Sequence, residues 1–108
     1  MPRYVPGAPY FNANRDPLYD FELKQKLPLF NGAFSQPFRD VLGYAPTAAA
    51  QYQGMARMLS SILHGAKPAD IPVEQPTVYD LVVNLNTAKA IGINIPPSIL
   101  ARATVVVE

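Results

Sequence analysis

The chain has 108 residues, the length of one small domain with room for a single modest hydrophobic core. Its 9 lysines and arginines oppose 8 aspartates and glutamates, and because these charges are scattered, electrostatics recruit neither nucleic acid nor an anionic membrane. The lack of cysteine excludes disulfides, thiolate nucleophiles and cysteine zinc sites.

The N-terminal part is expected to hold one helix and one short strand. Residues 1–13 are rich in proline and aromatic residues, which predicts an irregular lead-in. Asp16 supplies an N-cap and the proline after it suits a first helical turn, so we expect a helix over residues 17–26. The apolar run Leu27–Phe30 predicts a short strand, restricted by its proline to an edge or a strand beginning.

An amphipathic helix is the clearest element of the sequence. Residues 33–46 indicate a loop, with a turn of helix around Phe38–Leu42. Thr47 then acts as N-cap and Gly65 closes the helix. Apolar side chains recur along it at helical spacing, at Tyr52, Met55, Ala56, Leu59, Ile62 and Leu63.

The next segments form a connector, a strand and a helix. Residues 66–77 contain closely spaced prolines and predict an extended connector without helix. Residues 78–85 are rich in valine and leucine and predict a strand. A short helix follows, which Asn86 or Thr87 caps and Gly92 stops.

The chain closes with a helix and a short apolar stretch. Pro96–Pro97 opens a helix that runs through about Ala103. Residues 104–108 have two interpretations, a short strand or an adhesive edge. This order of helices and strands favours an α/β fold with parallel strands flanked by helices.

Side chains for catalysis are sparse. His64, the single histidine, falls in the last turn of the predicted long helix, where it meets free carbonyl groups, and we favour that role over catalysis. Ser60 and Ser61 lie alongside it rather than across from it, and the sequence has neither a nucleophile elbow nor a glycine-rich phosphate loop. One histidine and dispersed carboxylates give no metal-ligand spacing. We therefore expect no enzyme, no catalytic residue, no metal site and no cofactor.

Aromatic residues beside asparagines leave two interpretations. The pairs Phe11–Asn12 and Phe30–Asn31, together with Tyr44, fall in or next to predicted loops. Such groups supply stacking area and directed hydrogen bonds for a small-solute pocket. Ordinary packing of loop aromatics on a small core is the alternative, and composition alone favours it.

Four long stretches of the C-terminal half match a known family, namely His64–Thr77, Tyr79–Leu85, Thr87–Gly92 and Ile95–Ala103. They closely resemble the closing segment of the ABC-transporter substrate-binding family, whose members include tryptophan- and tyrosine-binding lipoproteins. Upstream, three shorter stretches are similar more loosely, namely Ala8–Asn12, Leu27–Phe30 and Gly43–Pro46.

The resemblance implies a fold and a site. It implies that residues 1–108 are a single partial domain, the C-terminal portion of a substrate-binding protein with part of a type I periplasmic-binding lobe. In open parallel sheets, ligands bind beyond the carboxyl ends of the strands. On that rule Asn12, Asn31 and Tyr44 face the cleft, and together with Phe11, the aromatic residue beside Asn12, they are the expected ligand-binding residues.

The resemblance also implies a role in bacterial ABC-type uptake, with a small solute such as an amino acid as ligand and an ABC permease as partner. An alternative is a non-catalytic interaction module that self-associates, as a homodimer through an exposed strand or apolar face. The family implies a periplasmic or cell-surface location. Met1–Tyr10 lacks a signal-peptide pattern, so the chain as written is expected to be cytoplasmic.

Overall fold

A computed structural model describes residues 3–32 and 37–108. The chain divides into two compact units. The first comprises Met1–Ala45 and Asp80–Glu108, and the second comprises Pro46–Tyr79. The second unit is therefore inserted in the sequence between the two parts of the first unit.

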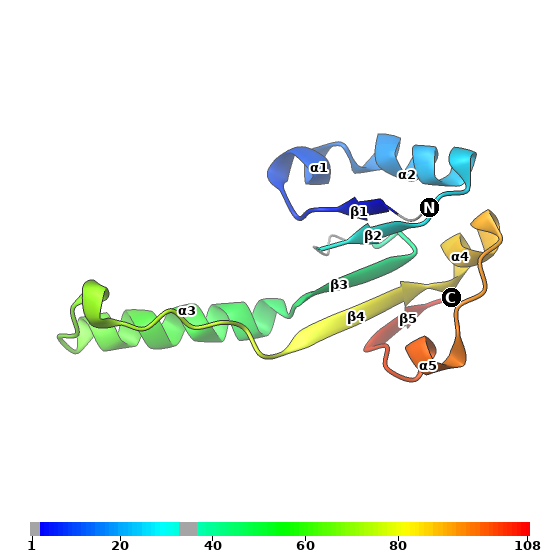
Figure 1. Cartoon of the computed structure of the whole chain (residues 1–108). Helices are drawn as coiled ribbons and strands as arrows, with labels where there is room; N and C mark the ends of the chain where they lie inside the picture. Colours follow the sequence, from blue (N-terminus) through cyan, green and yellow to red (C-terminus); the bar gives the residue numbers. More distant parts are fainter. Residues whose placement is uncertain (1–2, 33–36) are drawn as a thin grey trace. The chain divides into compact units, whose positions relative to one another are not determined.

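A five-stranded sheet forms the framework (Figure 1). Its strands lie in the order of the sequence: β1 (Arg3–Val5), β2 (Leu29–Asn31), β3 (Leu42–Pro46), β4 (Tyr79–Asn84) and β5 (Val105–Val107). The pairs β1–β2, β2–β3 and β4–β5 are parallel. The expected α/β fold with parallel strands flanked by helices is confirmed, and the last apolar stretch is a strand.

Only the central pair departs from the parallel arrangement. The Asn84 amide donates to the Val41 carbonyl, and the Thr47 amide donates to the Val78 carbonyl. Residue numbers rise along β3 as they fall along β4, so these two strands are antiparallel. The antiparallel arrangement follows from the inserted unit, because β3 leads from the first unit into it and β4 leads back.

The first unit has four helices among its described residues: α1 (Pro9–Ala13), α2 (Arg15–Gln25), α4 (Leu85–Ile91) and α5 (Pro97–Leu100). The expected helix over residues 17–26 is confirmed as α2, but the predicted N-cap at Asp16 is wrong, because the helix begins at Arg15 and Asp16 lies in its first turn. Lys26 ends it in a left-handed conformation, with φ of 51°. The expected irregular lead-in over residues 1–13 is wrong, since it contains β1 and α1. A strand of three residues is stabilised by its pairing with β2, which no local pattern reveals.

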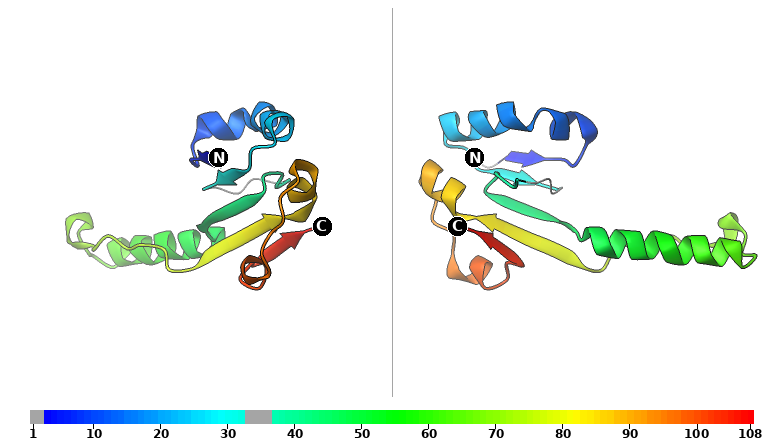
Figure 2. Two further views of the ribbon diagram at one scale, coloured as in Figure 1. Left: turned by 45° about the vertical axis from the view of Figure 1, so that its right-hand side comes forward. Right: turned by 180° about the vertical axis from the view of Figure 1, so that it is seen from behind.

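The core of the first unit lies between two helices and the sheet. Val41, Ala88 and Ile91 are buried together, and Leu23 and Leu42 pack against them. Leu23 belongs to α2, and Ala88 and Ile91 belong to α4. Both helices therefore pack on the part of the sheet that contains β3. Figure 2 shows from two further sides that α2 runs along the sheet beside β1 and β2.

Helix α3 (Ala48–Leu63) dominates the second unit. The Thr47 hydroxyl oxygen accepts a hydrogen bond from the Ala50 amide at 3.1 Å, which confirms the predicted N-cap. His64 is the C-cap and Gly65 follows with φ of 102°, a left-handed value that suits glycine. Within residues 3–32 and 37–108, no helix has the length and apolar character needed to cross a bilayer.

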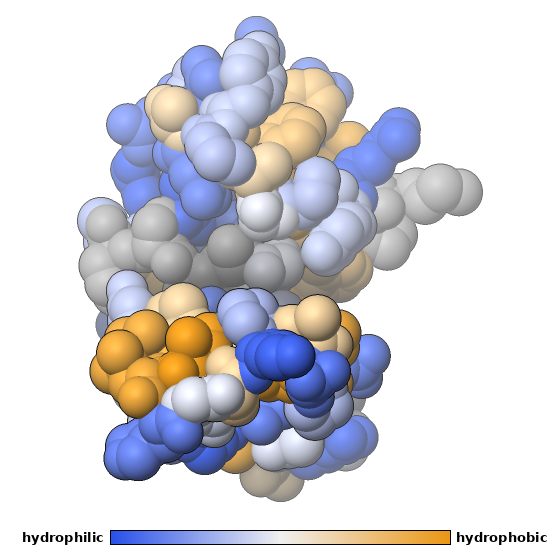
Figure 3. Space-filling view, turned by 90° about the vertical axis from the view of Figure 1, so that its left-hand side faces the viewer, coloured by the Kyte–Doolittle hydropathy of each residue, from blue (hydrophilic) through white to orange (hydrophobic). Residues whose placement is uncertain are grey.

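The connector after α3 returns along the helix. It contains one turn of 3-10 helix, Pro68–Asp70, which corrects the expectation of a connector without helix. Arg57 and Glu74 form an exposed ion pair at 3.0 Å that joins connector and helix. None of the residues of α3 is buried, so its apolar stripe faces outward. Figure 3 views this end of α3 and shows a hydrophobic patch bordered by hydrophilic side chains.

Three local predictions differ from the structure. Phe38–Leu42 forms no helical turn, because β3 begins at Leu42 and the residues before it are irregular; Ala33–Gln36 lie outside the described residues. Helix α4 is capped by Asn84, the last residue of β4, and not by Asn86 or Thr87. The predicted stop at Gly92 is confirmed, with φ of 81°. Helix α5 ends at Leu100, short of Ala103.

Replacement of Asn84 by alanine should destabilise the chain by about 2 kcal/mol. The Asn84 side chain accepts from the Thr87 amide and donates to the Phe38 carbonyl, and both bonds are buried. Urea unfolding measures the effect. Asn86→Ala is the matched control, because Asn86 is exposed and should change stability by less than about 0.5 kcal/mol. Equal losses in the two variants would contradict the cap assignment.

Candidate functional site

A cavity of about 270 Å³ opens in the first unit. Its polar lining comes from α1, from the first turns of α2 and from the segment before β3. The lining side chains that carry polar groups are Asn12, Arg15, Asp16, Tyr19, Arg39 and Asp40. A second, narrower crevice shares Arg15 and Asp40 with this cavity and is also lined by Val5 and Asn31, the final residues of β1 and β2.

A buried ion pair with a third partner forms the floor of this cavity. Asp40 Oδ2 accepts a hydrogen bond from Arg15 Nη2 at 3.1 Å and another from Asn31 Nδ2 at 2.9 Å. The side chains of Arg15 and Asp40 are only 17% and 9% exposed. Arg15 Nη1 is buried and has no hydrogen-bond partner among the described residues. Charged bonds at such burial are strong, and they hold α2, β2 and the segment before β3 together.

Glu22, on the same helix as Arg15, is fully buried, with 0% exposure. Its Oε1 accepts a hydrogen bond from the Leu29 amide at 2.9 Å, whereas Oε2 has no partner within the described part of the chain. Burial raises the pKa of the Glu22 carboxyl from 4.5 to about 7, and the negative charge of Asp40 adds to this. The backbone amides of Leu29 and Val41 act in the opposite direction. Glu22 therefore changes charge near neutral pH.

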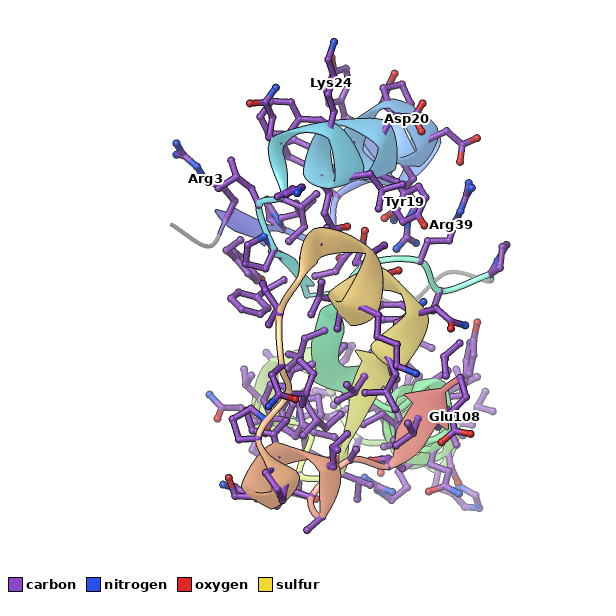
Figure 4. All side chains as sticks on the ribbon, turned by 90° about the vertical axis from the view of Figure 1, so that its right-hand side faces the viewer. Arg3, Tyr19, Asp20, Lys24, Arg39 and Glu108 are labelled. Carbon is purple, nitrogen blue, oxygen red and sulfur yellow. The ribbon has the colours of Figure 1, made fainter. Side chains whose placement is uncertain are left out.

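The rim of the cavity carries a second, exposed ion pair. Arg39 Nη1 lies 2.7 Å from Asp16 Oδ1, and the Arg39 guanidinium lies 4.4 Å from the centre of the Tyr19 ring. Figure 4 shows the Tyr19 and Arg39 side chains close together beside α2, while Asp20 and Lys24 point away from the body. Water screens exposed pairs of this kind, so this pair orients side chains more than it stabilises the fold.

The arrangement suits binding by hydrogen bonds and charge. Negatively charged carboxylates and positively charged guanidinium groups surround a space large enough for a small polar molecule. Across residues 3–32 and 37–108, no group of three histidine, aspartate or glutamate side chains is placed to hold a metal ion. His64 Nδ1 lies 2.7 Å from the Ser60 carbonyl at the end of α3, the helix-end role expected for it.

Three of the four predicted ligand residues lie at or near this site. Asn12 lines the cavity, Phe11 lines the crevice, and Asn31 is part of the buried floor. The Phe11 ring also packs edge-to-face on Tyr10, with centroids 5.6 Å apart. Tyr44 differs from its predicted loop position, because it lies in the middle of β3 and is 56% exposed. Its part in ligand binding stays a prediction.

Sequence reasoning missed the charged residues of the site. Arg15 and Asp40 are 25 residues apart, and neither belongs to a motif. The available signal was weak: Asp40 is a carboxylate next to the apolar Val41 and Leu42, in a stretch that otherwise continues into a strand. Glu22 gave no signal, because it falls on a helix with charged residues on several sides.

Known proteins resemble this chain in sequence and in fold. Residues 24–107 match the family model described as ABC transporter substrate binding protein. A search of curated proteins finds no match. Several solved structures share the fold over nearly the whole chain.

Three of these structures illustrate the likeness. A conserved domain protein from Vibrio cholerae has a TM-score of 0.85 and 26% identity, over 95% of this chain and 35% of its own. The ABC domain in complex with L-Trp from Streptococcus pneumoniae has a TM-score of 0.80 and 24% identity, over 96% and 36%. The ligand-free, open form of a substrate-binding protein with adhesive properties from Clostridium difficile has a TM-score of 0.66 and 21% identity, over 96% and 35%. This chain thus spans about a third of the length of the structures it matches.

Replacement of Glu22 by glutamine should alter how stability depends on pH. The folded pKa of about 7 lies above the ordinary 4.5, so the folded chain keeps a proton that the unfolded chain releases. The free energy of unfolding of the wild type therefore falls as the pH rises from 4.5 to about 7, whereas that of Glu22→Gln does not fall for this reason. Across this pH range, the free energy of unfolding of the variant should rise relative to that of the wild type by about 3 kcal/mol.

Urea unfolding at a series of pH values measures this difference. Asp20→Asn is the matched control, because Asp20 is an exposed carboxylate on the same helix. A constant difference between wild type and Glu22→Gln from acid to neutral pH would contradict the assignment.

Proposed function

Because this chain belongs to the family of ABC transporter substrate-binding proteins, we propose that it forms part of a binding site for a small solute and that it is not an enzyme. The observation that carries this proposal is the buried network of Arg15, Asp40 and Asn31 at the floor of a cavity. The network brings charged groups together without a nucleophile and base in contact, which suits non-covalent binding.

An amino acid is the solute class that we favour. It carries a carboxylate and an ammonium group, and the cavity presents arginines and aspartates that complement both. The cavity volume of about 270 Å³ lies just below the range of about 300–1,000 Å³ that is typical of small-molecule sites, which suits a small solute. One structure of similar fold is a complex with L-Trp, which supports the same class.

The rest of the site is expected to come from protein outside these residues. This chain spans 35% of the Vibrio cholerae structure, so one wall of a site between two lobes is what it can supply. Hinge closure of two lobes would then enclose the solute, and an ABC permease would receive it. The family resemblance supports a periplasmic or cell-surface place of action.

Isothermal titration of the chain with the natural amino acids tests the proposal, and we expect saturable binding of at least one. Asn12→Ala removes a polar side chain at the exposed rim and should weaken binding by up to about tenfold, the value of one hydrogen bond. Asn86→Ala is the control and should bind as the wild type does, since Asn86 does not line the cavity. A complete lack of saturable binding would sink the proposal.

Self-association is a second candidate, favoured by the outward apolar stripe of α3. Leu59 and Leu63 are 57% and 77% exposed on the same side of this helix. If the stripe pairs two copies, light scattering should give a dimer mass for the wild type and a monomer mass for Leu59→Glu. Ser60→Glu serves as the control, because it adds the same charge off the stripe. A monomer in the wild type would exclude this candidate.

A further inference from the structure

Glu22 is bonded to the backbone of β2, the strand that carries one group of the floor of the site. Its Oε1 accepts from the Leu29 amide at 2.9 Å, and Leu29 is in the same strand as Asn31. The Val41 amide also stabilises its ionised form, and Val41 is adjacent to Asp40. One side chain from α2 is thus bonded to the strand that carries Asn31, and Asn31 pairs with Asp40 in the floor.

The charges of this cluster do not balance when Glu22 is ionised. Arg15 supplies one positive charge and is bonded to Asp40, and Glu22 would add a second buried carboxylate to that pair. The rim pair of Arg39 and Asp16 is neutral as a whole. The lysines on the two packed helices, Lys24 and Lys89, are both exposed, so water screens them from the cluster.

An unmatched carboxylate in a buried site favours a positive charge nearby. Glu22 Oε2 has no partner among the described residues, and Asp40, whose negative charge raises the pKa of Glu22, lines the cavity. A cationic group that enters the cavity beside Asp40 lowers the cost of two buried carboxylates with a single arginine. A neutral or anionic group gives no such relief.

We propose that Glu22 is a positioning residue of the ligand site, and that its ionised carboxylate makes the site select solutes with a cationic group, such as an ammonium. This inference rests on the proposed function and deepens it, because it names the charge that the solute presents to the floor. Binding and ionisation are then linked in both directions. A bound cation favours release of the Glu22 proton, and a rise in pH through the Glu22 pKa of about 7 tightens cation binding.

The test uses the isotope-labelled chain and methylammonium chloride as probe, with sodium chloride as the salt control. The Asn31 side-chain amide reports on the floor, because it donates to Asp40. Titrations are compared at about pH 5.5 and about pH 8.5, on the two sides of the Glu22 pKa. We expect binding about fivefold tighter at the higher pH, the lower end of typical coupling between sites.

Two variants separate positioning from a merely structural role. Glu22→Gln should bind the probe equally at both pH values, whereas Asp20→Asn, an exposed change on the same helix, should keep the wild-type difference. If Glu22→Gln does not fold, the wild type alone decides: the Asn31 amide signal must titrate together with the Glu22 carboxyl carbon. Separate titration midpoints would overturn the inference.

The remaining outcomes also discriminate. An affinity for methylammonium that is the same at both pH values in the wild type, or no response of Asn31 to the probe, overturns the selection of cations by Glu22. Neither result touches the proposed function, which depends on saturable binding of an amino acid by calorimetry. If the chain binds an amino acid and the affinity does not depend on pH, the chain is a solute-binding protein in which Glu22 does not select cationic solutes.

Discussion

The buried contact between Asp40, Arg15 and Asn31 is the constraint on which the first unit depends. It joins three separate parts of the chain: the start of α2, the end of β2 and the segment that leads into β3. Removal of one partner from a buried ion pair costs about 3–5 kcal/mol, because the remaining charge is left uncompensated. The same contact that fixes these elements therefore also fixes the polar groups at the floor of the cavity.

The two units are stabilised in different ways. In the first, α2 and α4 bury apolar side chains against β3, and Val41 and Val83 are almost completely enclosed. In the second, α3 buries none of its residues and is held by its Thr47 cap, its helical hydrogen bonds and the exposed Arg57–Glu74 pair. A helix with a free apolar stripe gains little from burial, so its own capping and propensity carry more of its stability.

Family and site contribute different parts of the functional conclusion. The fold relates the chain to solute-binding proteins, and yet the structures it matches share only 21–26% identity with it. A fold of this kind accepts many ligands, because the ligand is chosen by a few side chains at the site. Arg15, Asp40 and the buried Glu22 are the groups of this chain that give its cavity a chemistry of its own.

The sequence by itself determined the elements whose signals are local. Helix α3 follows from its apolar period and Thr47, the end of α4 from Gly92, and the family from the stretches between His64 and Ala103. Only the tertiary structure decided the short strands β1 and β3, the cap of α4 by Asn84, and the meeting of Arg15 with Asp40. The strands and the ion pair depend on contacts between segments far apart in the chain, where pairing and burial outweigh local preference. The cap itself is a local bond, but Asn84 also donates to the carbonyl of Phe38, 46 residues away. The site is of this second kind, so the sequence indicated Asn12 and Asn31 but not the charged Arg15 and Asp40.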